Sequence, residues 1–229
     1  MLLKKSLLFV AVVVSLTLSQ TASAALLTFA NLADYNAQLI ASGIAETNFT
    51  DFDALVPMTP GSGSATGFSH NGIDFIGSVE TPLGVFSTAT ESDFTNSGLN
   101  FLGYNLTNNT DFIGGDTFSI ALPGGARAVR LNISTPNDIT DINFATLTVG
   151  GISINTLAAN FVPISGATRG YFLGIIDTTS SFESAAVSFA GLGLYRVDDV
   201  GFASIPEPSS LALAAMAGLF GFRRRRRIG

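Results

Sequence analysis

Most of the chain after Gly43 consists of short apolar runs separated by turn residues, and this pattern limits its fold more than any other feature. The runs are rich in Phe, Val, Ile and Thr, which favour β-strands, and Gly, Asn, Asp and Pro interrupt them. Phe118, Ile120 and Leu122 alternate with other residues, as in a strand with one buried face. The pattern predicts a mainly β protein, an antiparallel, jelly-roll-like β-sandwich. The expected strands are 47–52, 73–79, 85–88, 117–122, 128–133, 144–149, 152–157, 170–176, 185–190 and 194–203.

One short N-terminal helix precedes these strands. Asn31 is a favourable N-cap, and Leu32, Tyr35 and Leu39 recur on one helical face. Gly43 supplies a C-terminal stop. We therefore expect an amphipathic helix between Asn31 and Gly43.

Glycine-rich segments indicate two of the connections. Gly150 and Gly151 separate two expected strands and are typical of a tight hairpin turn. Segment 57–69 is rich in Gly and Ser, and we expect a loop there.

The contents of Cys, His and charged residues exclude several functions. The chain has no Cys, so it has no disulfide framework, thiolate zinc site or Cys nucleophile. Its single His, His70, excludes a multi-His metal site. Between Lys5 and Arg223, four arginines accompany all 17 acidic residues. Without a basic face the chain is not expected to bind nucleic acid.

The first 24 residues have the three parts of a secretory signal peptide. Lys4 and Lys5 form a basic start, residues 7–18 form an apolar run, and Ala22 and Ala24 fit an A-x-A cleavage pattern. We expect cleavage after Ala24, with the Sec export machinery and signal peptidase as partners.

The C-terminal region combines a chain break, an apolar segment and a basic end. Pro206 and Pro208 flank Glu207, so neither a helix nor a central strand is expected there. Residues 209–222 predict a transmembrane-type helix of about 21 Å. This is short for a hydrocarbon core of about 30 Å, so snorkelling arginines and local thinning complete the span. The basic end stays cytoplasmic, which places the preceding domain outside. It consists of Arg223, Arg224, Arg225, Arg226 and Arg227.

These elements resemble the PEP-CTERM sorting signal of Gram-negative bacteria. The resemblance covers residues 205–229, with Pro206, Glu207, Pro208, the apolar run and the arginines in the same order. It implies that an exosortase, a membrane-embedded cysteine transpeptidase-like enzyme, cuts the chain near the Pro-Glu-Pro motif. The cut chain is released or transferred to the cell surface. The resemblance also implies a link to exopolysaccharide production.

The chain is thereby divided into a signal peptide (1–24), a β-sandwich ectodomain (25–204) and a sorting tail (205–229). We expect export across the inner membrane of a Gram-negative bacterium, transient anchoring through 209–222, and a final place at the cell surface or in the biofilm matrix.

Two carboxylates near the end of the ectodomain are the candidate metal ligands. The motif from Tyr195 to Val200 resembles the last strand of galactose-binding-like jelly rolls, where an Asp often helps a structural calcium site. Ca²⁺ prefers oxygen ligands, so Asp198 and Asp199 are the expected metal residues. Because adjacent strand residues point to opposite faces, only one of them is expected to reach a given site. The alternative is an exposed pair beside Arg196. We expect that no cofactor is required, and Ca²⁺ is the one candidate ligand.

Other candidate residues have ordinary alternatives. Asp51 and Asp53 lie on one face if their strand continues, which favours shared ion binding or mutual repulsion. Tyr104 and Tyr171, each beside a Gly, are candidate sugar platforms, with packing at the core edge as the alternative. His70 lies near no strand-to-helix nucleophile elbow, so no catalytic site is expected around it.

The sequence therefore favours a non-enzymatic surface or extracellular-matrix protein associated with exopolysaccharide. The alternative is a calcium-dependent, lectin-like carbohydrate-binding module. A glycan-active enzyme needs a carboxylate pair in a cleft, and the absence of Trp disfavours a sugar-cleaving cleft.

Overall fold

The structure is a computed structural model that describes residues 26–61, 66–88, 95, 97–106, 109–135, 143–156, 161–165 and 168–204. These residues form one helix and 13 strands. The elements are β1 (Leu26–Phe29), α2 (Leu32–Ala41), β2 (Ala45–Thr50), β3 (Gly67–His70), β4 (Ile73–Ile76), β5 (Leu83–Ser87), β6 (Asn100–Tyr104), β7 (Thr117–Thr135), β8 (Ala145–Val149), β9 (Ile152–Asn155), β10 (Phe161–Ser165), β11 (Thr168–Asp177), β12 (Phe182–Phe189) and β13 (Arg196–Ser204).

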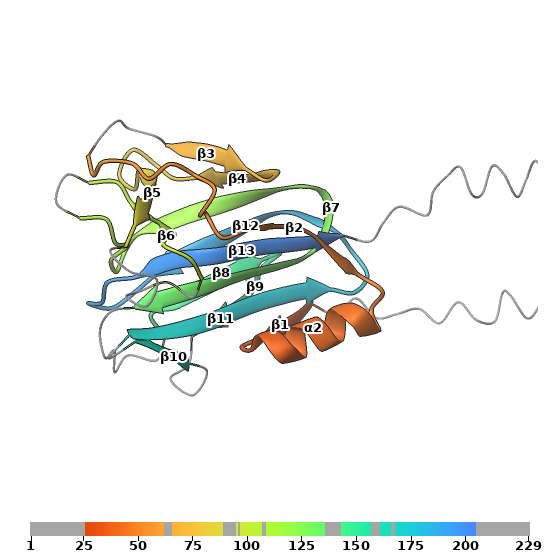
Figure 1. Ribbon diagram of the computed structural model, residues 1–229. Helices are drawn as coiled ribbons and strands as arrows, with labels where there is room; N and C mark the ends of the chain where they lie inside the picture. The colour runs from red at the N-terminus through yellow and green to blue at the C-terminus, as the bar shows by residue number, and fades with distance from the viewer. Residues whose placement is uncertain are drawn as a thin grey trace, which may run out of the picture.

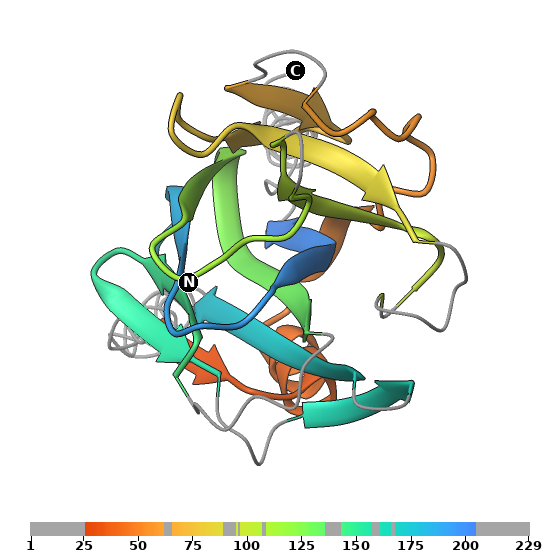
Figure 2. The same cartoon turned by 90° about the vertical axis from the view of Figure 1, so that its left-hand side faces the viewer.

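The long strand β7 joins two antiparallel layers (Figure 1). Its residues 117–121 pair with β12 and β4, whereas residues 126–135 pair with β11 and β13. Between these halves, Pro123, Gly124 and Gly125 bend the strand back, because Pro lacks an amide donor and Gly125 adopts a positive φ. The view along the strands in Figure 2 shows the layers wrapping around a common interior. The expected antiparallel β-sandwich is therefore confirmed.

Phenylalanine rings fill much of the interior between the layers. Phe112 stacks on Phe189 with ring centroids 4.8 Å apart. Phe144 stacks on Tyr195, also at 4.8 Å, and Phe189 reaches Tyr195 at 5.4 Å. These side chains are buried. The chain has no Trp, so packed Phe and Tyr rings supply the large aromatic groups of the core.

The expected helix is confirmed as α2, which packs on β11. Asn31 is its N-cap, and the Asn31 side chain accepts a hydrogen bond from the amide of Asp34 at 2.8 Å. Tyr35 and Leu39 are buried from one face of the helix. Gly43 follows the helix with φ 64°, where a side chain would be strained.

Turn chemistry accounts for two hairpins. Gly150 and Gly151 adopt φ of 56° and 84°, and Val149 pairs with Ile152 across them, which confirms the expected β8–β9 turn. His70 pairs with Ile73 in the β3–β4 hairpin.

Several expected strands differ from the observed ones. The expected strands 117–122 and 128–133 are the two halves of β7, because one strand continues through the bend between them. Four strands were not expected: β1, β3, β6 and β10. β3 and β6 contain Gly, Ser or Asn, β1 is only four residues long, and β10 contains Pro163. The loop expected at 57–69 is therefore wrong where it overlaps β3.

Candidate functional site

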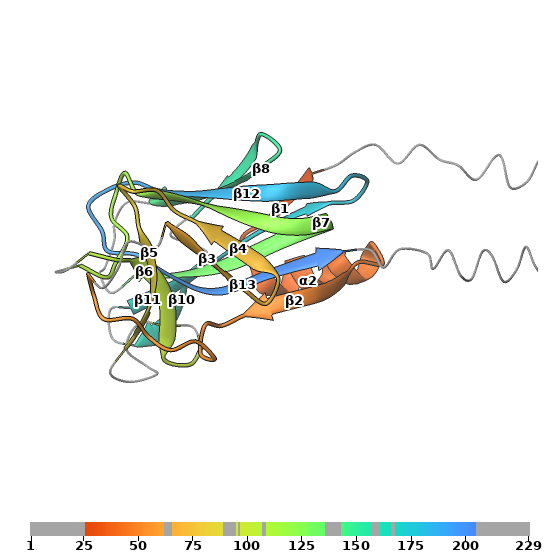
Figure 3. The ribbon, with the colours of Figure 1, turned by 90° about the horizontal axis from the view of Figure 1, so that it is seen from above.

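The described domain begins and finishes at the same end of the sandwich. Leu26 pairs with Asp177, the last residue of β11. Ser204 pairs with Ala126 of β7 and Ala45 of β2. We call the region formed by these five residues the terminal end, and Figure 3 shows that β1 begins and β13 ends on this side of the molecule. The sorting tail therefore leaves the domain at the same end at which the described chain enters it.

The tail is joined to a strand that is paired on both sides. From Val200 to Ser204, β13 lies between β7 and β2 and pairs with both. Phe202 and Ala203 are buried immediately before Ser204. Ser204 thus anchors the tail to the core, and only Ile205 separates it from Pro206.

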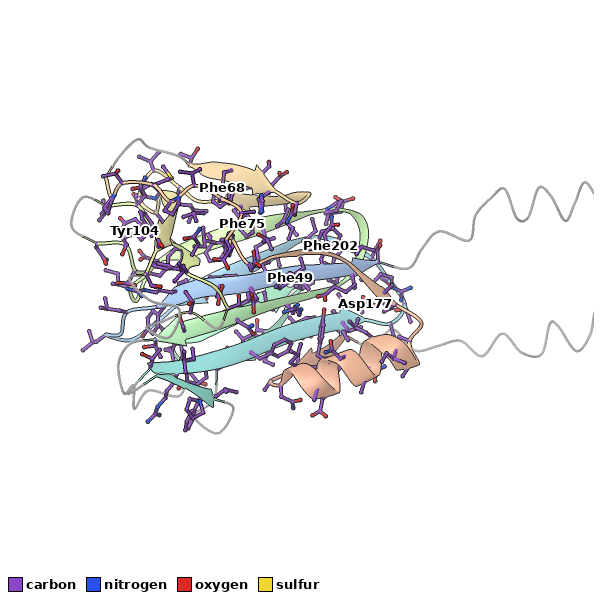
Figure 4. The ribbon with its side chains drawn as sticks, in the orientation of Figure 1. Phe49, Phe68, Phe75, Tyr104, Asp177 and Phe202 are labelled. Carbon is purple, nitrogen blue, oxygen red and sulfur yellow. The ribbon has the colours of Figure 1, made fainter. Side chains whose placement is uncertain are left out.

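A tight turn after β11 closes the terminal end (Figure 4). The Asp177 carboxylate accepts hydrogen bonds from the amides of Thr179 (2.8 Å) and Ser180 (2.7 Å). Arg127 Nε donates to the Asp177 carbonyl oxygen at 3.0 Å. Burial acts to raise the pKa of Asp177, but the hydrogen bonds from Ser180 and Thr179, with the charge of Arg127, together lower it.

The predicted sorting and processing residues lie outside the described residues. They are Ala22, Ala24, Pro206, Glu207, Pro208, Arg223, Arg224, Arg225, Arg226 and Arg227. The expected helix 209–222 lies outside them too. In the part of the chain that the structure describes, no helix has the length and apolar character to cross a bilayer.

Asp198 and Asp199 meet one common partner in the structure. Val197 pairs with Ile133 and Val200 pairs with Leu131, so two residues of β13 face one residue of β7 in a β-bulge. The Ser97 amide donates to Asp198 Oδ2 at 2.7 Å, and Ser97 Oγ donates to Asp199 Oδ1 at 2.6 Å. The expectation that only one carboxylate reaches a given site is wrong, because the bulge breaks the alternation of the strand. This group is the acidic cluster, comprising Asp53, Ser97, Asp198 and Asp199.

Burial dominates the electrostatics of Asp199 in the acidic cluster. Asp198 and Asp199 are 0% and 8% exposed, so they are not an exposed pair. Burial raises the pKa of Asp199, and the charge of Asp51 raises it further. Hydrogen bonds from Ser97 and Asn132, together with the Arg130 charge, oppose this rise.

Asp53 holds the same segment as Asp198 and Asp199. Its Oδ1 accepts hydrogen bonds from the amides of Leu99 and Asn100, each at 2.9 Å. Gly98 lies so close that an added Cβ would be 1.4 Å from Asp53 Oδ2, so only Gly fits there. The expected strand through Asp51 and Asp53 does not continue, because β2 ends at Thr50.

Arg196 binds a carboxylate that is distant in the sequence. It forms an ion pair with Asp111, and its guanidinium carbon lies 4.3 Å from the centroid of the Phe101 ring. Asp111 sits 85 positions away in the sequence, so no local pattern signalled this pair. The same holds for Ser97 and Asn132, whose roles arise from tertiary packing alone.

The two candidate sugar platforms differ in how far they are buried. Tyr171 is 3% exposed and packs edge-on against Phe144 at 4.8 Å, so an exposed platform there is wrong. Tyr104 is half-buried, and its hydroxyl donates to the Glu80 carbonyl oxygen at 2.6 Å. Figure 4 places Tyr104 at the end of the sandwich opposite Asp177.

The hypothesis of a metal site at Asp198 and Asp199 stays a prediction. Within the described ranges, no three His, Asp or Glu side chains are placed to share a metal ion. The carboxylates instead receive the donors of Ser97, and Asn132 donates to Asp199 Oδ2 at 2.7 Å. This arrangement fixes segment 97–100 against β13.

Comparison with known proteins identifies the tail. Residues 204–227 match the model of the PEP-CTERM protein-sorting motif. The match begins at Ser204, the last residue of β13, and includes the Pro-Glu-Pro residues and the arginine cluster. Curated proteins yield no significant match to the chain. The motif marks a protein that exosortase sorts to the cell surface.

Proposed function

We propose that this chain, which carries a PEP-CTERM sorting motif, is a non-enzymatic surface protein whose β-sandwich is the exported cargo. The observation that carries the proposal is the boundary at Ser204, where strand β13 ends and the matched motif starts. The signal peptide starts export through Sec, and signal peptidase removes it after Ala24. The tail then anchors the chain in the inner membrane until exosortase cuts it.

The proposed destination is the exopolysaccharide layer of a Gram-negative cell. The acidic character of the chain, with 17 acidic residues, supports this destination. Divalent cations can bridge a negatively charged protein to an anionic polysaccharide, because each ion neutralises charge on both partners. The proposed contribution is structural adhesion within the matrix.

Fractionation of the host with and without its exosortase gene tests the sorting step. We expect a tail-bearing precursor in the inner membrane without the gene and a shorter extracellular form with it. A chain that stops at Ser204 is the control, because it lacks the motif and its location should not depend on the gene. Identical size and location of the full chain in both strains would contradict the proposal.

Sedimentation with exopolysaccharide from the same host tests the destination. We expect the mature protein to sediment with the polymer in buffer containing Ca²⁺ and to stay in the supernatant after chelation. A protein that stays in the supernatant in both conditions contradicts matrix association by cation bridging.

A calcium-dependent carbohydrate-binding module is the second candidate. The β-bulge supports it, since the bulge brings Asp198 and Asp199 to one common neighbour, Ser97. An ion that binds only the folded state must raise the melting temperature. A calcium-induced rise that Asp199→Asn abolishes favours this candidate, and an unchanged melting temperature counts against it.

A further inference from the structure

Three loops at the terminal end carry no charge of their own. The loops around Leu26 and Ser204 comprise residues 42–44, 123–125 and 178–181, and none of them carries a charged side chain. Next to these loops, Asp177 is buried and Arg127 is half-buried. Two exposed carboxylates lie at the rim: Glu46, which pairs with Arg130, and Glu183, which follows Phe182. The loops beside the start of the tail are therefore themselves uncharged.

An exposed apolar side chain lies near these loops. Ile40 is 81% exposed in the last turn of α2. The helix leads through Gly43 to Ala45, which pairs with Ser204. Figure 1 shows this end of α2 on the same side of the molecule as the arrowhead of β13.

The length of the tail keeps the terminal end close to the membrane. Residues 205–208 span at most about 14 Å when fully extended. The apolar run 209–222 gives about 21 Å of helix, less than the hydrocarbon thickness of about 30 Å. The run therefore has no excess length to act as a spacer outside the bilayer.

We propose that the terminal end lies against the phospholipid headgroups of the outer leaflet of the inner membrane until the tail is cut. The inference rests on the proposed anchoring by the tail. Neutral loops suit this position, because anionic lipids attract basic residues and repel acidic ones within a Debye length. Ile40 adds an apolar contact at the rim.

The same orientation directs the opposite end of the sandwich away from the membrane. Leu192, in the β12–β13 connection, is fully exposed there. β12 runs from Phe182, which pairs with Ala126, to Phe189 just before this connection. At 3.3 Å per residue, the strand separates the two ends by about 23 Å. The loops at Leu192 therefore face the envelope beyond.

Quenching by spin-labelled lipids tests this orientation in the full chain. The protein has no Cys, so Gly124→Cys and Leu192→Cys each give one labelling position for a fluorophore. A Cβ at Gly124 meets nothing within 4 Å, and Leu192 is exposed. Each labelled chain is reconstituted into phosphatidylethanolamine–phosphatidylglycerol vesicles that carry a nitroxide on the headgroup. Melting temperatures equal to that of the parent verify folding.

We expect strong quenching at position 124 and little at position 192. A spacer of 20 Gly and Ser residues inserted after Ser204 extends the tether by about 25 Å, and quenching at 124 should then fall to the level at 192. Equal quenching at both positions, or stronger quenching at 192, in chains that float with the vesicles overturns the orientation alone. Chains that do not float overturn the proposed anchoring, and the orientation with it.

Discussion

Ser204 lies opposite Ala126 in the β13–β7 ladder, directly after the bend that sends β7 from one layer to the other. The last residue of β13 therefore lies at the junction of both layers. Cutting the tail beyond this pair leaves the ladder complete, whereas removing residues before it opens the core.

Truncation tests whether the fold is independent of the tail. A domain that stops at Ser204 should melt at the same temperature as one that stops at Pro208, because Pro206 and Pro208 are not expected to extend the strand. Removal of 202–204 should lower the free energy of unfolding by about 3 kcal/mol or more, since Phe202 is buried. Urea denaturation measures both. An equal loss of unfolding free energy in the chain that stops at Ser204 and in the chain that lacks 202–204 would contradict the assigned boundary.

Two buried tyrosines should respond in opposite ways to loss of the hydroxyl group. Within the described residues, the Tyr35 hydroxyl is buried without a hydrogen-bond partner, and burial raises its pKa. Tyr35→Phe should therefore leave the free energy of unfolding unchanged or raise it by about 1 kcal/mol. The Tyr195 hydroxyl donates to Ala190 O at 2.6 Å and accepts from the Gly193 amide. Tyr195→Phe should cost about 1 to 2 kcal/mol. Denaturant titration of both variants decides, and a loss at Tyr35 equal to that at Tyr195 refutes the assignment.

Asp199→Asn should gain stability relative to the parent as the pH rises. Burial raises the pKa of Asp199 in the folded state, so the folded protein binds more protons than the unfolded chain above the unfolded value of about 3.9. Parent stability contributed by this group thus falls from pH 4 towards neutrality. The difference in unfolding free energy, variant minus parent, should be higher at pH 7 than at pH 4. Asp116, whose pKa burial also raises, is present in both proteins and cancels. A variant-minus-parent difference in unfolding free energy that falls as the pH rises would contradict this prediction.

Asp177→Asn should show the reverse dependence. Although burial opposes ionisation, hydrogen bonds from Ser180 and Thr179 lower the pKa of Asp177. Its stabilisation is therefore present above the unfolded value of about 3.9 and is lost as the pH falls through the folded value. We expect a deficit of about 1 to 2 kcal/mol at pH 7 that shrinks as the pH falls below about 3.9. Denaturation across this range measures it, and a deficit independent of pH would rule out the charge as its source.

Local patterns predicted much of the fold because their signals are short-range. The alternation of apolar residues located both halves of β7, and the two glycines located the β8–β9 turn. Asn31 and Gly43 set the limits of α2. The strands that escaped prediction, such as β3 with its Gly and His, depend on neighbouring strands for their hydrogen bonds and have little apolar pattern of their own.

The contacts of the acidic cluster could not be predicted from local sequence patterns, because they join residues that are far apart in the chain. The sequence singled out Asp198 and Asp199, but alternation assigned them to opposite faces. The bulge opposite Asn132 and the approach of Ser97 depend on residues far away in the chain. Tyr171 likewise has a polar ring beside Gly170, yet its position in a central strand buries it.

Mass spectrometry of the mature protein from its own host tests the central claim most directly, since it reads both termini in one measurement. Sorting through the tail predicts an N-terminus at Ala25 and a C-terminus near Pro206, Glu207 and Pro208. A mature chain that still carries Arg223 to Arg227 would contradict it.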